Sequence, residues 1–522
     1  MKRICALLLA GLLLAPAGCK DFLDVNTNPN APETVSANLY LPPMLHWVAT
    51  APQYDGRYIG PYTQQWMVPS SSPNTYVWQR MGYRAANDAA AQQWRDVYWS
   101  LGQNLVDMNN IAEKEERWDV LGVGLILKAW GWQVLTDMHG EIIIKEAFDA
   151  SRTTFDYDTQ EYAYFEVDSL LHAAIDNLQR TDGAVDQGYL AVGDKIYNGD
   201  RAKWLKFAYG LLAINRNHFT NRPTYNPDSV IALVDQSFQS NADDALFPYP
   251  ALSGNDDRNF YGTSRDNLTS YRQTEFVVGL MDGTEFGGTV DPRMSRMLAL
   301  APDGQYHGLD VDSLGYGALT ESERPMNFFG YAGLPGAGQP SRYIFSDKSR
   351  FPIMTYAQLQ FVKAEAQYLK GQKDLALATY KNAISAHLDF VNARNTDDGQ
   401  SPSQITAAEK DAFLADPNIV PAVGNFTLSH IMSQKYIAQW AWGHNELWMD
   451  MRRYHYTDQE SGIEVFRGFQ IPKTLFVNNG GKPVQRARPR YNSEYVWNQA
   501  GLSAIGALAD DYHTKPLWIT QP

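Results

Sequence analysis

Two short segments place a histidine beside a carboxylate, the combination that both proton transfer and metal binding use. They are His139-Gly140-Glu141 and His444-Asn445-Glu446. Such pairs also arise by chance, and no metalloprotease, Gly-x-Ser-x-Gly, phosphate-binding or dinucleotide-binding motif accompanies them. We therefore expect both segments to be structural, and we predict no catalytic residue and no enzyme activity.

Glycoside hydrolysis needs two carboxylates that converge from distant parts of a chain. The 58 acidic residues of this chain do not single out such a pair. An exported glycoside hydrolase is therefore the less favoured of the alternative functions.

One acidic segment partly fits a calcium-binding loop. Asp310, Asp312, Gly315 and Glu321 match its first, third, sixth and twelfth positions, but Leu314 occupies the fifth, where an oxygen ligand belongs. We expect a solvated acidic loop here, and we predict neither a metal nor a cofactor.

The composition favours binding of a flat, hydroxyl-bearing ligand. Trp, Tyr and Phe make up 13% of the chain, and ring faces pack well on the C–H patches of sugars. A net charge of −14 argues against nucleic acid, whose phosphates require a basic surface. The candidate ligand contacts come from two turn-rich stretches, with ordinary packing as the alternative for each: Trp66, Tyr76, Trp78, Tyr261, Arg265 and Tyr271.

Helices must position these residues. Apolar side chains recur at helical spacing from Trp94 to Met108, and Asp200 is a suitable N-cap for a later helix. The same criterion predicts helices over 117–137, 160–180, 200–214, 355–370, 373–392 and 429–454. Between Phe247 and Pro352 the pattern gives way to Gly, Pro, Asn and Ser with interspersed aromatics, which predicts long functional loops.

One helix pair has the spacing of a tetratricopeptide unit. Gly371 occupies the turn, and Ala376, Tyr380 and Ala383 follow at the small–aromatic–small positions of the second helix. The other pairs are degenerate, so we expect the repeats to form a scaffold. A helical-repeat adaptor without a small ligand remains an alternative.

The N-terminus has the pattern of a lipoprotein signal. Lys2-Arg3 precedes an apolar run from Ile4 to Ala15, which is too short to span a bilayer, and small residues lead to Cys19. We predict a signal peptide over residues 1–18, lipidation of Cys19, an anchor and extended tether over 19–40, and one domain over 41–522. Only Cys19 would remain in the mature chain, because Cys5 lies in the removed segment, so no disulfide forms.

The motifs, in their order along the chain, resemble the SusD/RagB family of nutrient-binding outer-membrane lipoproteins. The matching blocks are Cys19 to Asn30, Leu135 to Ala147, Ile196 to Ala208, Asp291-Pro292-Arg293, Ala364-Glu365-Ala366 with Gly371, Gln434 to Ala438, Glu446 to Arg453 and Arg490 to Asn498. Departures include Asn492, where the family usually has a proline.

The resemblance implies a mainly α, SusD-like fold in which tetratricopeptide-like helix pairs form a scaffold and long irregular loops bind the ligand, with little β structure. We place the scaffold at about 88–240 and 353–455 and the ligand-side region at about 247–352. The resemblance also implies an outer-membrane, cell-surface location and a SusC-like, TonB-dependent β-barrel that receives an oligosaccharide or a peptide.

Overall fold

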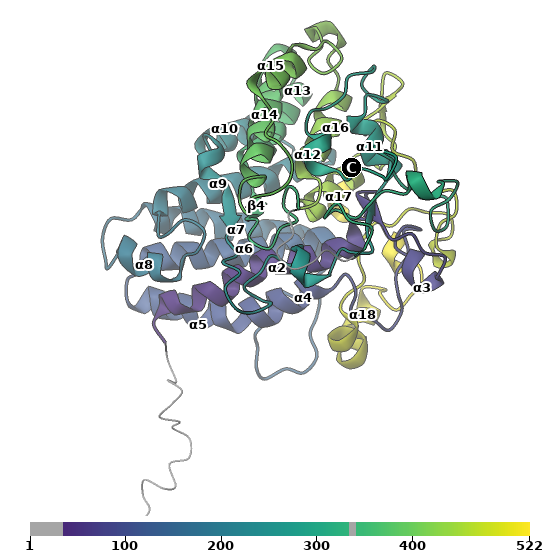
Figure 1. The fold of residues 1–522 in the computed structure, drawn as a ribbon. Coiled ribbons are helices and arrows are strands. Elements are labelled where there is room, and N and C mark those ends of the chain that lie inside the picture. Colours follow the sequence, from purple (N-terminus) through teal and green to yellow (C-terminus); the bar gives the residue numbers. More distant parts are fainter. Residues whose placement is uncertain (1–34, 334–340) are drawn as a thin grey trace, which may run out of the picture.

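Helices dominate the computed structural model, which describes residues 35–333 and 341–522 (Figure 1). Cys19 and residues up to 34 lie outside the described chain. The α-helices are α2 (Leu41–Ile59), α3 (Pro73–Tyr76), α4 (Gln92–Arg95), α5 (Gln103–Lys114), α6 (Trp118–His139), α7 (Gln160–Gln179), α8 (Gln187–Gly193), α9 (Arg201–Asn217), α10 (Pro227–Gln236), α11 (Glu275–Met281), α12 (Met294–Met297), α13 (Tyr356–Leu369), α14 (Lys373–Arg394), α15 (Ala407–Ala415), α16 (Leu428–Gln439), α17 (His444–Arg453) and α18 (Gln499–Ala504).

Strands form three short antiparallel pairs in the described chain, β1–β3, β2–β4 and β5–β6. They are β1 (Trp66–Met67), β2 (Ala245–Phe247), β3 (Arg272–Gln273), β4 (Phe351–Met354), β5 (Gln459–Glu460) and β6 (Ile463–Glu464). The short helical segments used below are η1 (Ala37–Tyr40), η2 (Asp96–Gly102), η3 (His218–Asn221) and η9 (Tyr491–Tyr495). The predicted mainly α fold with little β structure is confirmed.

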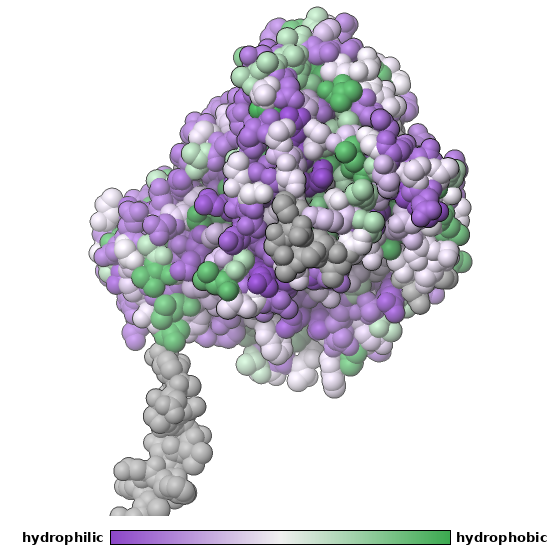
Figure 2. All heavy atoms as spheres, in the orientation of Figure 1, coloured by the Kyte–Doolittle hydropathy of each residue, from purple (hydrophilic) through white to green (hydrophobic). Residues whose placement is uncertain are grey.

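The scaffold is a succession of helices packed side by side. Helix α6 lies between α5 and α7, α9 packs on α7 and α10, and α10 leads through α13 to α14. Figure 1 shows α5 to α9 as one layer, with α10 and α13 to α15 rising above it and the irregular segments gathered beside α11, α12 and α17. Hydrophilic residues cover most of the face in Figure 2, and the hydrophobic ones form small scattered groups.

Most predicted helices are confirmed to within a few residues. Asp200 caps α9 by accepting hydrogen bonds from the backbone amides of Ala202 and Lys203. Gly371 takes a left-handed conformation (φ +84°) in the turn between α13 and α14. Beyond it Ala376, Tyr380 and Ala383 are fully buried, as the tetratricopeptide spacing predicts.

Two sequence expectations differ from the structure. The predicted helix over 429–454 is two helices, α16 and α17, because Trp440 leaves the helical path and donates its indole N–H to the Gln65 carbonyl at 3.2 Å. Ala441 then adopts φ +73°. Residues 37–40, predicted as part of the extended tether, instead form η1, in which Asn38 is buried and donates to the Tyr189 carbonyl.

A chain of buried charges ties the helices together. Glu365 of α13 accepts two hydrogen bonds from Arg453 of α17, at 2.8 and 3.2 Å, and Lys435 of α16 lies 2.8 Å from Asp450 of α17. All four side chains are fully buried. A buried charge is stable only beside a partner of opposite charge. The positions of α13, α16 and α17, which carry these four side chains, therefore depend on one another.

The charge chain continues to α6 through His218 of η3. Its Nε2 lies 3.0 Å from Glu446, which is 3.8 Å from Lys435, and its Nδ1 lies 3.5 Å from Asp137 of α6. Burial lowers the pKa of His218, but Glu446 and Asp137 outweigh burial and raise it to about 9. His218 is therefore a cation at neutral pH, so three cations face four carboxylates in this buried cluster.

Removing the Glu365 charge should destabilise the protein strongly. Glu365→Gln removes the carboxylate that Arg453 pairs with at 2.8 Å, and breaking a buried ion pair costs about 3–5 kcal/mol. The free energy of unfolding from urea denaturation measures this. Asp176→Asn is the matched control, because Asp176 is an exposed carboxylate on α7, and it should change stability by less than about 0.5 kcal/mol. Equal effects of the two variants would contradict the structural role of the cluster.

The stability should fall at alkaline pH because of His218. Its folded-state pKa of about 9 exceeds the ordinary 6.5, so its contribution is complete below pH 6.5 and is lost as the pH rises through about 9. The shift corresponds to about 3 kcal/mol. His218→Gln should therefore flatten the alkaline limb of a stability–pH curve, whereas His172→Gln, at a side chain that is 57% exposed, should leave it unchanged.

Candidate functional site

An aromatic surface pocket lies where α2 meets the segment after α3. Tyr54, Arg57 and Tyr58 point to one face of α2 because they are three and four residues apart. Together with Trp78 and Tyr271 they line a space of about 320 Å³, which we call the aromatic pocket. The rings of Tyr58 and Trp78 lie 5.1 Å apart, and the Arg57 guanidinium lies 4.2 Å from the Tyr54 ring centre. The pocket therefore offers ring faces and a fixed cation.

The opposite face of α2 is locked into the core. Gly56 faces His444 and Tyr261 so closely that a Cβ would lie 2.3 Å from the imidazole. His444 hydrogen-bonds Tyr261 and Gln65, and burial lowers its pKa to about 3, so it stays neutral. This contact fixes the rotation of α2 and thereby the direction of its pocket-facing side chains.

Residues 84–89 form the polar wall of the aromatic pocket, which we call the ridge. Asp88 anchors it, since its carboxylate lies 2.6 Å from Arg490 and accepts hydrogen bonds from the backbone and side-chain amides of Asn492. Ala86 and Ala90 hold left-handed conformations, with φ of 51° and 59°, which cost about 1–2 kcal/mol each. The anchor at Asp88 thus holds the ridge in a shape that the chain alone would not prefer.

A second pocket lies on the other side of the ridge. It also encloses about 320 Å³ and is lined by residues of the C-terminal segment, so we call it the C-terminal pocket. Trp78, Arg84, Asn87 and Ala89 line both pockets.

The structure brings only some of the predicted ligand contacts together. Trp78 and Tyr271 both line the aromatic pocket, and Tyr76 is half-buried at the end of α3 close by in sequence. Arg265 is 13% exposed and donates to the carbonyl of Asn255.

Trp66 and Tyr261 have no exposed surface, so in this conformation they serve packing. Trp66 contacts a group of rings that includes Phe328 and Trp440, and its indole donates to the Gly56 carbonyl. Sequence reasoning had no helix at α2 and so missed Tyr54, Arg57 and Tyr58. Their i, i+3, i+4 spacing after Pro42-Pro43 was the available signal.

The aromatic pocket suits binding rather than hydrolysis. Burial raises the pKa of Tyr58, against the opposing effect of Arg57, so its hydroxyl remains a neutral donor and acceptor. Among the residues the structure describes, Asp88 is the one carboxylate that lines this pocket, and Arg490 already pairs with it. A glycosidase site uses two carboxylates across the scissile bond.

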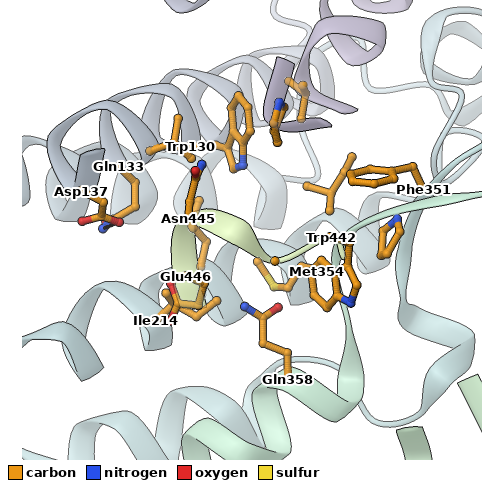
Figure 3. A pocket seen from close by; sticks show the side chains of 17 residues that line it. Trp130, Gln133, Asp137, Ile214, Phe351, Met354, Gln358, Trp442, Asn445 and Glu446 are labelled. Atoms are coloured by element: carbon orange, nitrogen blue, oxygen red, sulfur yellow. Dashed lines mark hydrogen bonds between the residues drawn. The ribbon is translucent and has the colours of Figure 1, made fainter. Parts of the chain in front are cut away.

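A pocket of about 80 Å³ lies next to the buried charges (Figure 3). Asp137 and Glu446 lie at one end of it and Phe351 and Trp442 at the other. Asp137, His218 and Glu446 are the one group of three close metal-binding side chains in residues 35–333 and 341–522. The two nitrogens of His218 face different carboxylates, and Lys435 already neutralises Glu446, so this arrangement is satisfied by protons and cations of the protein itself.

The Asp310 segment does not form a calcium loop in the described structure. Asp312 lies 3.6 Å from both Arg80 and Lys473, and Asp310 accepts hydrogen bonds from Asp312 and Ser313 within its own turn. The one three-residue metal-binding group found does not include this segment. Its carboxylates are therefore used inside the protein.

The helices of the described chain contain no stretch that is both long and apolar enough to span a bilayer. The longest apolar helix, α6, is instead almost entirely buried among its neighbours.

Comparison with known proteins relates most of the chain to one family. The family described as "Starch-binding associating with outer membrane" matches residues 29–470. No match was found among curated proteins.

Solved structures share the fold at low sequence identity. A SusD/RagB family protein from Bacteroides thetaiotaomicron is 21% identical with a TM-score of 0.68, over 93% of this chain and 99% of that one. A chitin-binding SusD homologue from Flavobacterium johnsoniae is 18% identical with a TM-score of 0.68, over 93% and 98%. The family match covers most of the chain, and these neighbours have its helical scaffold from end to end. The protein therefore belongs to the SusD-like family of outer-membrane nutrient-binding proteins.

Proposed function

We propose that this protein is a cell-surface lipoprotein that binds an oligosaccharide in the aromatic pocket and delivers it to a SusC-like, TonB-dependent transporter. Lipid on Cys19 would hold it to the outer membrane, where several acyl chains give stable anchorage. It would bind and release its ligand without breaking a bond. The observation that carries the proposal is the convergence of four rings and an arginine on one surface pocket of a SusD-like scaffold.

The pocket has the two components that sugar recognition requires. The half-buried rings of Tyr58 and Tyr271 can cover the C–H faces of a pyranose, with the buried Trp78 behind them, and burial of these faces drives association. Gln79, Arg84 and Asn87 supply donors and acceptors that fix the orientation of the hydroxyl groups. A peptide with aromatic or aliphatic side chains could use the same rings, so the ligand panel must contain both classes.

Removing a ring from the pocket should weaken binding without unfolding the protein. Tyr58→Ala and Tyr271→Ala change half-buried side chains, and each should lower the affinity about tenfold because one stacking face is lost. Calorimetric titration against oligosaccharides and peptides measures this.

Trp99→Ala is the matched control for these variants, since Trp99 is 75% exposed and lines neither of the two pockets. Unchanged affinity in both tyrosine variants would place the binding site elsewhere. Co-purification with a barrel while every glycan and peptide fails to bind would favour the helical-repeat adaptor.

Cys19→Ala should release the protein from the outer-membrane fraction. Its urea denaturation curve should not move, because the buried core of the described chain is built from residues from Ala37 onward. Cys5→Ala is the matched control, since Cys5 lies in the predicted signal peptide and should leave the lipid anchor intact. Retention of Cys19→Ala in the membrane of cells that lack the barrel would refute the anchor.

A further inference from the structure

The two pockets beside the ridge are neighbours with a common wall. Trp78, Arg84, Asn87 and Ala89 contribute to both, and the ridge residues between them are exposed or half-buried. A ligand that fills one pocket therefore needs to cross only this short wall to reach the other.

The C-terminal pocket also presents rings. Tyr491 and Tyr495 of η9 are nearly parallel, with centres 5.9 Å apart and an interplanar angle of 15°. Arg488 lies 4.5 Å from the Tyr83 ring centre and 5.3 Å from that of Tyr495. Tyr495 is committed to the fold through its bond to the Ala507 carbonyl, which leaves Tyr491, half-buried, as the ring available to a ligand.

The charge around the two pockets is opposite to that of the protein. The chain carries −14, yet the pocket linings contain Arg57, Arg84, Arg486 and Arg488 against Asp88 and Asp510. Arg486 pairs with Glu141, and Asp88 pairs with Arg490. Within the described chain, Arg57, Arg84 and Arg488 then have no carboxylate partner, and the guanidinium of Arg488 donates to the backbone carbonyls of residues 507, 509 and 510.

Arg84 is the cation best placed for a ligand. It is exposed, it lines both pockets, and it makes no hydrogen bond or ion pair with any other residue in the described part of the chain. The Arg57 guanidinium lies against Tyr54 and bonds through Nε to that residue's carbonyl, so its plane is fixed while its charge is not neutralised. Guanidinium groups pair with carboxylate and sulfate in a bidentate manner.

We infer that the ligand is an acidic oligosaccharide that occupies both pockets and places a carboxylate or sulfate on Arg84 as it crosses the ridge. The inference rests on the proposed function and specifies the chemical class of its ligand. Rings on either side hold the sugar faces, and the unpaired arginines select the charge. The local surplus of arginine side chains favours acidic over neutral chains once they are in the pockets.

Matched glycan pairs test the charge. The probes are oligogalacturonates with their fully methyl-esterified counterparts, and κ-carrageenan oligosaccharides with their desulfated counterparts, which separate carboxylate from sulfate. At least one acidic probe should bind about tenfold more tightly than its neutral counterpart. That preference should shrink as the ionic strength rises. If no acidic probe outperforms its counterpart, the inference is wrong.

Variants locate the charge and the second pocket. Arg84→Gln should remove the preference for the acidic probe, because it should weaken that probe much more than the neutral one, whereas Arg350→Gln, at an exposed arginine outside both pockets, should change neither. Tyr491→Ala should weaken long acidic chains but not chains that fill one pocket. Trp497→Ala, which is 72% exposed and lines neither pocket, is its control.

The outcomes separate this inference from the proposed function. Equal binding of acidic and neutral glycans, or an Arg84→Gln variant that keeps the preference, would overturn the inference and leave a neutral-glycan binder. If the affinity of Tyr491→Ala depends on glycan length as it does in the unmodified protein, the C-terminal pocket does not bind the ligand. Failure of every glycan would overturn the proposed function with it.

Discussion

The buried charges between α6 and α17 impose the central constraint on this molecule. Glu365, Lys435, Asp450 and Arg453 are fully buried, and the carboxylates lie beside the two cations and offset their charge. A hydrophobic core tolerates small shifts of one helix against another, but ion pairs at 2.5 to 3 Å do not. The cluster therefore fixes α13, α16, α17 and, through His218, α6 in one arrangement.

The surface pockets inherit their geometry from that arrangement. Helix α17 begins at His444, whose imidazole reaches Tyr261 and packs against Gly56 of α2. Rotation of α2 in turn decides where Tyr54 and Tyr58 point. A continuous series of short contacts thus leads from the buried ions to the rings at the surface. The helices position most of each pocket, and the loops complete its wall.

Sequence patterns predicted the scaffold well and the pocket only in part. Helical patterns located α6, α7, α9, α13 and α14. One face of α7 and of α9 is apolar, whereas α6 is apolar all round and buried on nearly every side. These patterns could not reveal the break at Trp440, since the reason is a distant partner, the carbonyl of Gln65. The same limit applies to Trp66 and Tyr261. Ring type signals an aromatic role, but only the fold decides whether the ring faces a ligand or Phe328.

The sequence of the ridge can change without disturbing the packing of the helices. Its six residues lie outside the helices and are fastened mainly by one carboxylate, yet they bound two cavities at once. Insertions, deletions or a new loop sequence between Tyr83 and Ala90 would reshape both cavities while the helical frame stayed intact. Homologous proteins can thereby evolve different ligand specificities through changes confined to a few residues.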